Sequence, residues 1–169
     1  WFPAMAASLG AAYVLAGRTA EGVSLLEAAV ERAGSAQIVA SYSLWVTYLG
    51  EACLQAGRRA EALEVGRRAA RLAREHGERG YEAWALRLLG EIAAGDDPPD
   101  VEAAEAAYRE AMGRAGELGM RPLLARCQLG LGLLYRRAAH EARARTHLAT
   151  AAALLHELEM ASWRERAGA

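Results

Sequence analysis

Four leucine–glycine pairs recur at nearly constant spacing, and they constrain the fold of this chain more than any other feature. The pairs are Leu9-Gly10, Leu49-Gly50, Leu89-Gly90 and Leu131-Gly132, and they lie 40, 40 and 42 residues apart. Self-similarity at a fixed period of this size is typical of proteins built from repeated structural units. The two extra residues of the last interval fall in a Gly-Asp-Asp-Pro-Pro sequence at 95–99, which favours a loop. We therefore expect four copies of one unit.

Each of these glycines lies in a stretch rich in Ala and Leu, where a helix is expected. A glycine inside a helix costs about 1 kcal/mol relative to Ala, so its recurrence at one column requires a packing reason. Close approach of a second helix supplies that reason. The columns expected to face the glycines are also small, namely Gly22, Ala62, Ala104 and Ala144, and Ala29, Ala69, Ala111 and Ala151. The predicted unit is a pair of closely packed antiparallel helices.

One column departs from the pattern. Leu26, Tyr108 and Leu148 are large, whereas the second unit has Gly66 at the same place. Two outcomes are open for that unit. Either Val65 fills the space, or the second hairpin is packed less tightly than the others.

Turn and capping signals divide the chain into four helical hairpins. We expect them over about 3–34, 36–77, 80–119 and 121–159, with a partial helix over 160–169 that covers the end of the stack. Turns are expected at Gly17 and Gly57, and N-caps at Thr19 and Asp100. Left-handed residues that end the second helix of a hairpin are predicted at Gly34, Gly77 and Gly119.

The residues after the leucine–glycine pairs resemble the tetratricopeptide repeat family. Tyr13 follows the first pair and Tyr135 the last, as in the family's Leu-Gly-x-x-Tyr pattern. The likeness covers nearly the whole chain, but the units are 40 residues long instead of the usual 34, and they lack a regular proline. The resemblance implies an all-α fold, a right-handed α-solenoid of four helix hairpins plus a capping helix, in a single domain over 1–169.

The longer units also resemble the C-terminal regions of certain bacterial multidomain proteins. Segments such as YEAWALRLLGEIA at 81–93 and HELEM at 156–160 are similar to those of signalling ATPases, adenylate cyclase-like proteins and LuxR- or MalT-like regulators. All 20 basic residues are Arg, which is typical of high-GC bacterial coding. The resemblance implies a regulatory module of a larger bacterial protein.

Charge and hydropathy exclude several classes of partner. The formal net charge is -1, so the chain lacks the long-range attraction that binding to nucleic acid or to an anionic membrane requires. No apolar run approaches the roughly 18 residues of a membrane span, and no signal peptide is visible at the N-terminus. We expect a cytoplasmic protein whose partner is another protein or peptide.

The sequence contains no recognisable catalytic or metal-binding motif. It has no phosphate-binding glycine loop before a lysine and no His-Glu-x-x-His, and its four histidines form no i, i+4 pair. Cys53 and Cys127 are too far apart to suggest a metal site, so we expect buried, reduced thiols. The chain is therefore predicted to be no enzyme and to need no metal or cofactor.

The tetratricopeptide resemblance implies a concave groove lined by the first helix of each hairpin, where the family binds peptides. Its columns fall on Thr47, Tyr48, Glu51 and Gln55 in the second unit, on Trp84, Arg87 and Glu91 in the third, and on Arg126, Arg136 and Arg137 in the fourth. The first unit contributes apolar residues, Ala4, Ala7, Ala11, Val14 and Leu15. Such a groove suits a hydrophobic segment followed by acidic residues. Tyr48 and Trp84 are alternatively core residues.

Two functions remain open at this point. The first is a protein-interaction scaffold that binds a peptide or another domain of the same protein. The alternative is a sensor of a small ligand, as in bacterial transcriptional activators with related repeats, with Trp84, Arg87, Arg126 and Arg136 forming the pocket. The oligomeric state and the identity of the partner are not specified by the sequence.

Overall fold

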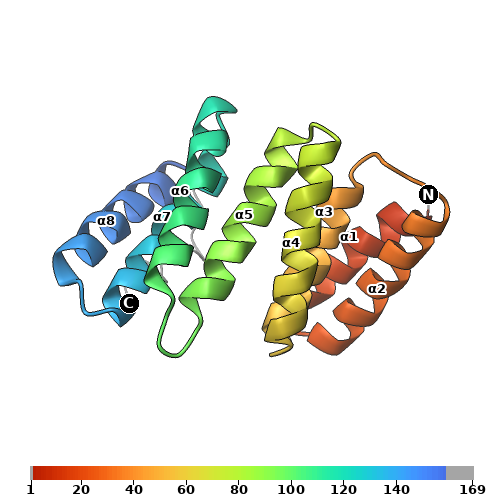
Figure 1. The fold of residues 1–169 in the computed structure, drawn as a ribbon, viewed down its shortest axis with the longest axis horizontal. Helices are drawn as coiled ribbons and strands as arrows, with labels where there is room; N and C mark the ends of the chain where they lie inside the picture. Colours follow the sequence, from red (N-terminus) through yellow and green to blue (C-terminus); the bar gives the residue numbers. More distant parts are fainter. Residues whose placement is uncertain (1, 159–169) are drawn as a thin grey trace. The chain divides into compact units, whose positions relative to one another are not determined.

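The computed structural model describes residues 2–158, which form eight α-helices and contain no strand (Figure 1). The helices are α1 (Phe2–Leu15), α2 (Thr19–Ser35), α3 (Tyr42–Gln55), α4 (Arg59–Glu75), α5 (Arg79–Ala94), α6 (Val101–Glu117), α7 (Arg121–Arg137) and α8 (Glu141–Glu157). The all-α prediction is confirmed. The capping helix predicted over 160–169 lies outside the described residues.

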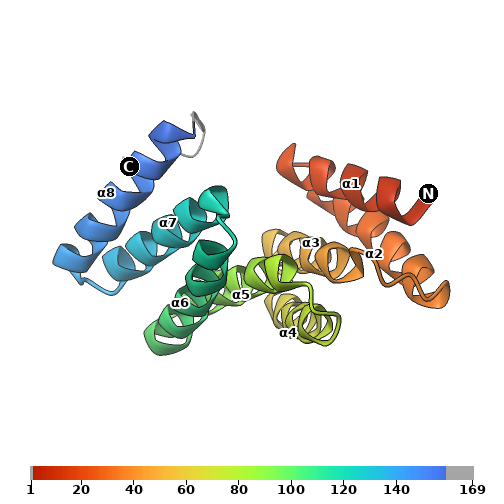
Figure 2. The ribbon, with the colours of Figure 1, turned by 90° about the horizontal axis from the view of Figure 1, so that it is seen from above.

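The chain divides into two compact units, residues 1–88 and 89–169, and the division falls inside α5. In the first unit α1 packs on α2, α3 packs on α4, and both helices of the first hairpin contact α3 (Figure 2). In the second unit α7 packs on α6 and on α8. Helices that follow one another in sequence thus pack together, as a helical repeat requires.

The four repeated glycines lie where another helix approaches closely. A Cβ placed on Gly10 would lie 3.0 Å from the Gly22 carbonyl oxygen in α2, and one on Gly90 would lie 3.0 Å from the ring of Tyr108 in α6. A Cβ on Gly132 would lie 3.1 Å from the backbone nitrogen of Leu148 in α8. One on Gly50 would lie 2.7 Å from the Leu88 side chain. A side chain at any of these positions would force a neighbouring atom to move, and at Gly10 and Gly132 backbone atoms of the facing helix are among those contacts, in agreement with the packing reason inferred from the sequence.

The gap expected at Gly66 is filled by two side chains. A Cβ on Gly50 would lie 2.7 Å from Leu88 Cδ2 and 3.4 Å from Val65 Cγ1, whereas the Gly66 backbone is 3.6 Å away. Val65 does compensate, as one of the two predictions had it. Leu88, from α5, supplies the rest, so the second hairpin is completed by the helix that follows it.

Most of the predicted turn and cap residues have the expected geometry. Gly17, Gly57, Gly77 and Gly119 have φ angles of +78°, +75°, +68° and +66°. Asp100 is the N-cap of α6 and accepts a hydrogen bond from the Ala103 N–H at 3.0 Å. At a helix C-terminus the left-handed turn lets the following N–H groups bond the last carbonyls of the helix, and at the N-terminus a side-chain acceptor bonds a free N–H group.

Three local predictions are wrong. Gly34 lies within α2, and the left-handed residue that follows this helix is Gln37. Thr19 is the first helical residue instead of the N-cap, which is Arg18, and the Arg18 guanidinium binds Glu21 in the first turn at 2.8 Å. The second hairpin was expected from about residue 36, but α3 begins at Tyr42 because the chain turns again at Ser41, with φ of +62°.

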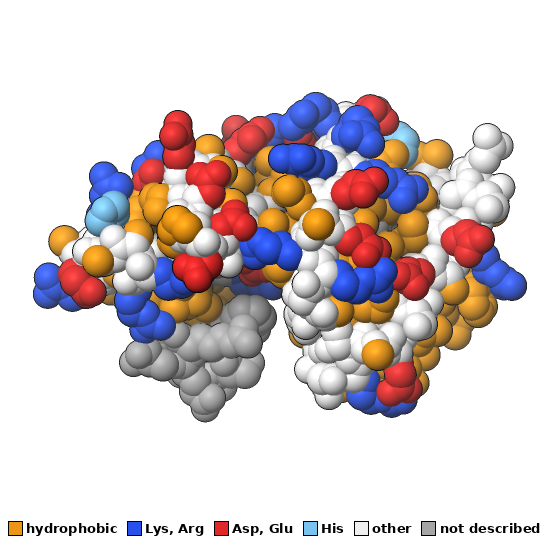
Figure 3. All heavy atoms as spheres, turned by 60° about the horizontal axis from the view of Figure 1, so that its bottom comes forward, with side chains coloured by type: hydrophobic (Ala, Val, Ile, Leu, Met, Phe, Trp, Pro, Cys, Tyr) orange, Lys and Arg blue, Asp and Glu red, His pale blue; other side chains and the backbone are white. Residues whose placement is uncertain are grey.

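Acidic and basic side chains are interspersed on the face drawn in Figure 3. Several pair one turn apart on the same helix, such as Arg114 with Glu110 at 2.9 Å. Pairs of this kind contribute a few tenths of a kcal/mol and mainly solvate the surface. Across residues 2–158, no helix combines the length and the apolar character needed to cross a bilayer.

Candidate functional site

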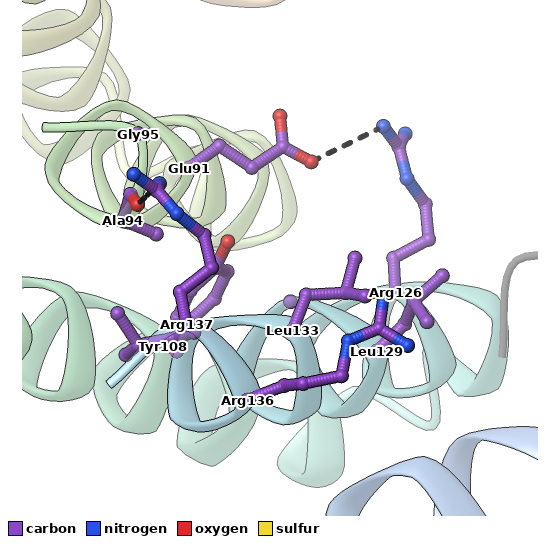
Figure 4. Close-up of a pocket in the computed structure, with 11 residues that line it drawn as sticks. Glu91, Ala94, Gly95, Tyr108, Arg126, Leu129, Leu133, Arg136 and Arg137 are labelled. Atoms are coloured by element: carbon purple, nitrogen blue, oxygen red, sulfur yellow. Dashed lines mark hydrogen bonds and ion pairs between the residues drawn. The ribbon is translucent and has the colours of Figure 1, made fainter. Parts of the chain in front are cut away.

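The second unit contains a pocket of about 460 Å³ between the C-terminal end of α5 and one face of α7 (Figure 4). Its lining comes from three helices and the start of the α5–α6 loop: Glu91, Ala94, Gly95, Tyr108, Arg126, Leu129, Gly130, Leu133, Leu134, Arg136 and Arg137. Seven of these eleven residues are uncharged, and the only polar group on their side chains is the Tyr108 hydroxyl. The floor of the pocket is therefore mainly apolar. The charged residues are Glu91 and the three arginines.

The apolar floor depends on two glycines that make room for Tyr108. Its buried ring lies against Gly90 of α5, and a Cβ placed on Gly130 of α7 would lie only 2.5 Å from Tyr108 Cζ. Glycine at both positions allows the ring of an α6 residue to lie under the two neighbouring helices. Leu129 and Leu133 of α7 extend the same floor (Figure 4).

The rim carries three arginines and one glutamate. Arg126 of α7 and Glu91 of α5 approach each other across the pocket, with 3.9 Å between Nη2 and Oε1, and both side chains are partly buried (Figure 4). A pair this long and partly solvated is weak, so an incoming carboxylate can compete with Glu91 for Arg126. Arg136 is exposed and belongs to the last turn of α7.

Arg137 has a structural task at the same rim. Its Nη1 donates to the Ala94 carbonyl, and its Nη2 donates to the Asp96 carbonyl at 2.9 Å. Ala94 is the last residue of α5, where the helix leaves acceptors without intrahelical donors and where a cation is favoured, and Asp96 lies in the loop that follows. Arg137 therefore fixes one wall of the pocket, while Arg126 and Arg136 are the cations that can meet a ligand.

Four of the ten predicted site residues lie together in this pocket: Glu91, Arg126, Arg136 and Arg137. The other six lie in the first unit. Thr47 is buried, and its hydroxyl donates to the Ser43 carbonyl at 2.9 Å. Arg87 is buried as well and forms an ion pair with Glu51. Buried side chains of this kind cannot touch a partner without a rearrangement of the core.

The remaining predicted residues of the first unit are more accessible. Trp84 and Tyr48 are half-buried, and Gln55 is exposed at the end of α3. The Arg87 guanidinium carbon lies 5.4 Å from the centre of the Trp84 ring, so the indole contributes a cation–π contact to the buried ion pair. Trp84 thus contacts the buried ion pair of this unit.

Sequence reasoning missed the apolar part of the pocket, which Tyr108, Leu129, Leu133 and Ala94 provide. One signal was available. Gly130 precedes the repeated pair Leu131-Gly132, and no other unit has a glycine at that column. An additional glycine on a helix face indicates a second close approach, which here is the Tyr108 ring.

A second polar cluster joins α6, α7 and α8 outside the pocket. The Tyr135 hydroxyl donates to Glu105, and the Tyr135 ring lies 5.3 Å from that of His147. His147 Nδ1 is 2.6 Å from Gln128 Oε1, and Arg143 lies over the Tyr135 ring. Burial and the bond to Glu105 raise the pKa of Tyr135, while burial and the nearby Arg109 lower the pKa of His147.

The lowered pKa of His147 makes stability depend on pH. The folded state binds a proton here less readily than the unfolded state, whose histidine titrates near 6.5. The free energy of unfolding should therefore fall as the pH is lowered through 6.5, and this penalty should be absent well above that pH. Urea unfolding at pH 7.5 and 5.5 measures the difference. His147→Gln should reduce this difference, and an unchanged difference in that variant would contradict the assignment.

The described residues hold no group of three or more His, Cys, Asp or Glu side chains placed to bind a metal ion. Cys53 and Cys127 are buried free thiols, as expected, and burial raises the pKa of Cys53 to about 11. A thiol with so high a pKa is a poor nucleophile. The candidate site is therefore the arginine-rimmed apolar pocket of the second unit.

No protein family model matches this sequence, and it has no match among curated proteins.

Proposed function

We propose that this chain is a protein-interaction module that binds an acidic, partly apolar peptide or a neighbouring domain through the pocket of its second unit. The observation that carries the proposal is a pocket of about 460 Å³ whose apolar floor lies beside three arginines and a single glutamate. An apolar pocket with a few charged groups at its edge is the usual form of a recognition site, because the pocket supplies binding energy and the charges supply specificity.

The finer description of the fold belongs to the same proposal. The regular columns of the sequence and the packing of successive helices support a tetratricopeptide-like, right-handed solenoid of four units. The narrower resemblance of the repeats supports the proposal that the module is part of a larger bacterial signalling protein of the cytoplasm. In that setting it acts by binding and carries no catalysis of its own.

The pocket indicates which ligand groups fit. An apolar side chain such as leucine would occupy the floor formed by Tyr108, Leu129 and Leu133, and burying it is worth about 2 kcal/mol. A carboxylate next to it would reach Arg126 or Arg136. Because these arginines are partly or fully solvated, each such pair adds at most about 1 kcal/mol and serves mainly to select acidic partners.

A matched pair of labelled peptides tests the proposal by fluorescence anisotropy. One is a 12-residue peptide of leucine and glutamate, and the other has lysine in place of every glutamate. We expect the acidic peptide to bind, and Arg126→Glu or Arg136→Glu to weaken it about tenfold, because each change replaces attraction by repulsion.

Arg145→Glu is the control for these two variants. It makes the same charge change at an exposed position of α8 that does not line the pocket, so binding should be nearly unaffected. Equal affinity for the acidic and basic peptides, or an equal loss in all three variants, would show that the pocket is not the recognition site.

A small organic ligand is the second candidate, because the volume of the pocket lies within the roughly 300–1,000 Å³ typical of ligand sites. Of the residues first considered for a ligand pocket, Arg126 and Arg136 line this one, while Trp84 and Arg87 belong to the first unit. A screen of carboxylic acids with apolar tails would favour this candidate if one of these acids raised the melting temperature of the unsubstituted protein and neither peptide bound.

A further inference from the structure

The first helix carries an apolar stripe that no described residue covers fully. Phe2, Met5 and Leu9 recur at helical spacing on one face of α1, and they are 49%, 69% and 47% exposed. We call these three residues the α1 stripe. The 14 residues of α1 include no charged side chain. Large exposed apolar side chains that share one face indicate a surface that another element covers.

The repeat itself indicates what that element is. The residues 40 positions later, Tyr42, Trp45 and Leu49 of α3, are only 8%, 8% and 7% exposed. In α3 this face has the preceding hairpin to pack on, since both α1 and α2 contact α3. The corresponding columns of α7 again hold buried residues, Cys127 and Leu131, and α7 packs on the preceding α6.

The α2 residue that lies against the first of these columns is a glycine. A Cβ placed on Gly34 of α2 would lie 3.0 Å from the Tyr42 hydroxyl, so the end of α2 lies directly beside the first residue of α3. The large Tyr42 side chain thus packs against a glycine of the hairpin before it. The three residues of a second α1 stripe are all large, so a second copy of the stripe offers no such glycine.

We propose that the α1 stripe is a docking face for a further helical hairpin of this repeat type, joined to the polypeptide ahead of Phe2. The hairpin would present a small residue beside Phe2, as α2 presents Gly34 beside Tyr42. Consecutive elements of a repeat protein pack against each other, so a hairpin in the same polypeptide is favoured over a separate molecule. This inference is independent of the pocket and of the function proposed for it.

A copied hairpin tests this proposal by thiol accessibility. A second copy of residues 2–41 replaces Trp1 and is joined directly to residue 2 of the complete chain. The original α1 then follows a copied α2, just as α3 follows α2. Met5→Cys is introduced in the original α1 of both the extended and the unextended chain. We expect its modification by a thiol reagent to be at least about tenfold slower in the extended chain, because the thiol reacts only when the hairpin opens.

Two further variants keep the test specific. Ser24→Cys is the control: Ser24 is exposed, and its counterpart Glu64 remains exposed although a hairpin precedes it, so its modification rate should be the same in both chains. Adding Leu9→Glu to the original α1 should restore fast modification of the thiol at position 5, since a charge cannot be buried against an apolar face.

Two results would overturn the proposal. One is an equal modification rate of the position-5 thiol in both chains, including the case in which circular dichroism shows the copied hairpin to be unfolded. The other is self-association of the unextended chain in sedimentation equilibrium that Met5→Glu abolishes, which would assign the α1 stripe to a second copy instead.

Discussion

Replacing Gly22 by alanine should lower the free energy of unfolding by about 2 kcal/mol, although alanine is the better helix former. Gly22 lies in α2 where this helix crosses α1. A Cβ at this position would lie 2.5 Å from Val14 Cγ2 and 2.8 Å from the Gly10 carbonyl oxygen. One of these atoms is backbone, so the clash is relieved only if the two helices separate. That separation costs more than the roughly 1 kcal/mol of helix propensity gained.

Gly113→Ala is the matched control, because Gly113 lies inside α6 and a Cβ there meets no atom within 4 Å. This substitution should raise the free energy of unfolding by about 0.5–1 kcal/mol through helix propensity alone. Urea unfolding followed by circular dichroism measures both variants under the same conditions. If Gly22→Ala stabilised the protein as much as Gly113→Ala does, close packing would not be the reason for the repeated glycines.

Close helix contacts were the most predictable part of this fold. A glycine in a helix has a known cost, so its recurrence at Gly10, Gly50, Gly90 and Gly132 could be interpreted without a structure. The filling of the space at Gly66 was only half predictable. Val65 is adjacent in sequence, but Leu88 comes from the next helix, which an alignment of columns within one hairpin does not include.

The charged rim of the pocket was also predictable in part. Arg126, Leu129, Leu133 and Arg137 follow one another at helical spacing, so the period of the helix alone places them on one face of α7. The capping of α5 by Arg137 was not predictable, because it depends on where the loop at 95–99 brings the last carbonyls of that helix. Arg136 and Arg137 are adjacent in sequence but have different tasks for this reason.

The burial of Arg87 could not be inferred from its residue type, because arginine is almost always solvated. Its position on α5 gave only the direction of the side chain. Whether that direction leads to solvent or to protein depends on how closely α3 and its Glu51 approach. A predicted groove residue therefore lies in the core, where its charge has consequences for stability.

Arg87→Met should lower the free energy of unfolding by about 3 kcal/mol. The Arg87 side chain is fully buried and pairs with Glu51, whose carboxylate is largely buried too. Methionine fills similar space but removes the guanidinium from this ion pair, and removing one partner of a largely buried ion pair is costly. The cation–π contact with Trp84 is lost as well.

The double variant Arg87→Met with Glu51→Gln separates charge from packing. If loss of the charge interaction between Arg87 and Glu51 causes most of the effect, the double variant should be more stable than the sum of the single effects implies, by about 1–2 kcal/mol. Arg67→Met, at an exposed position of α4, should change the free energy of unfolding by less than about 0.5 kcal/mol. Strictly additive losses at Arg87 and Glu51 would mean that the ion pair contributes nothing beyond the packing of its two side chains. In that case the packing of the Arg87 side chain would stabilise the core, and its charge would have to interact favourably with groups other than Glu51.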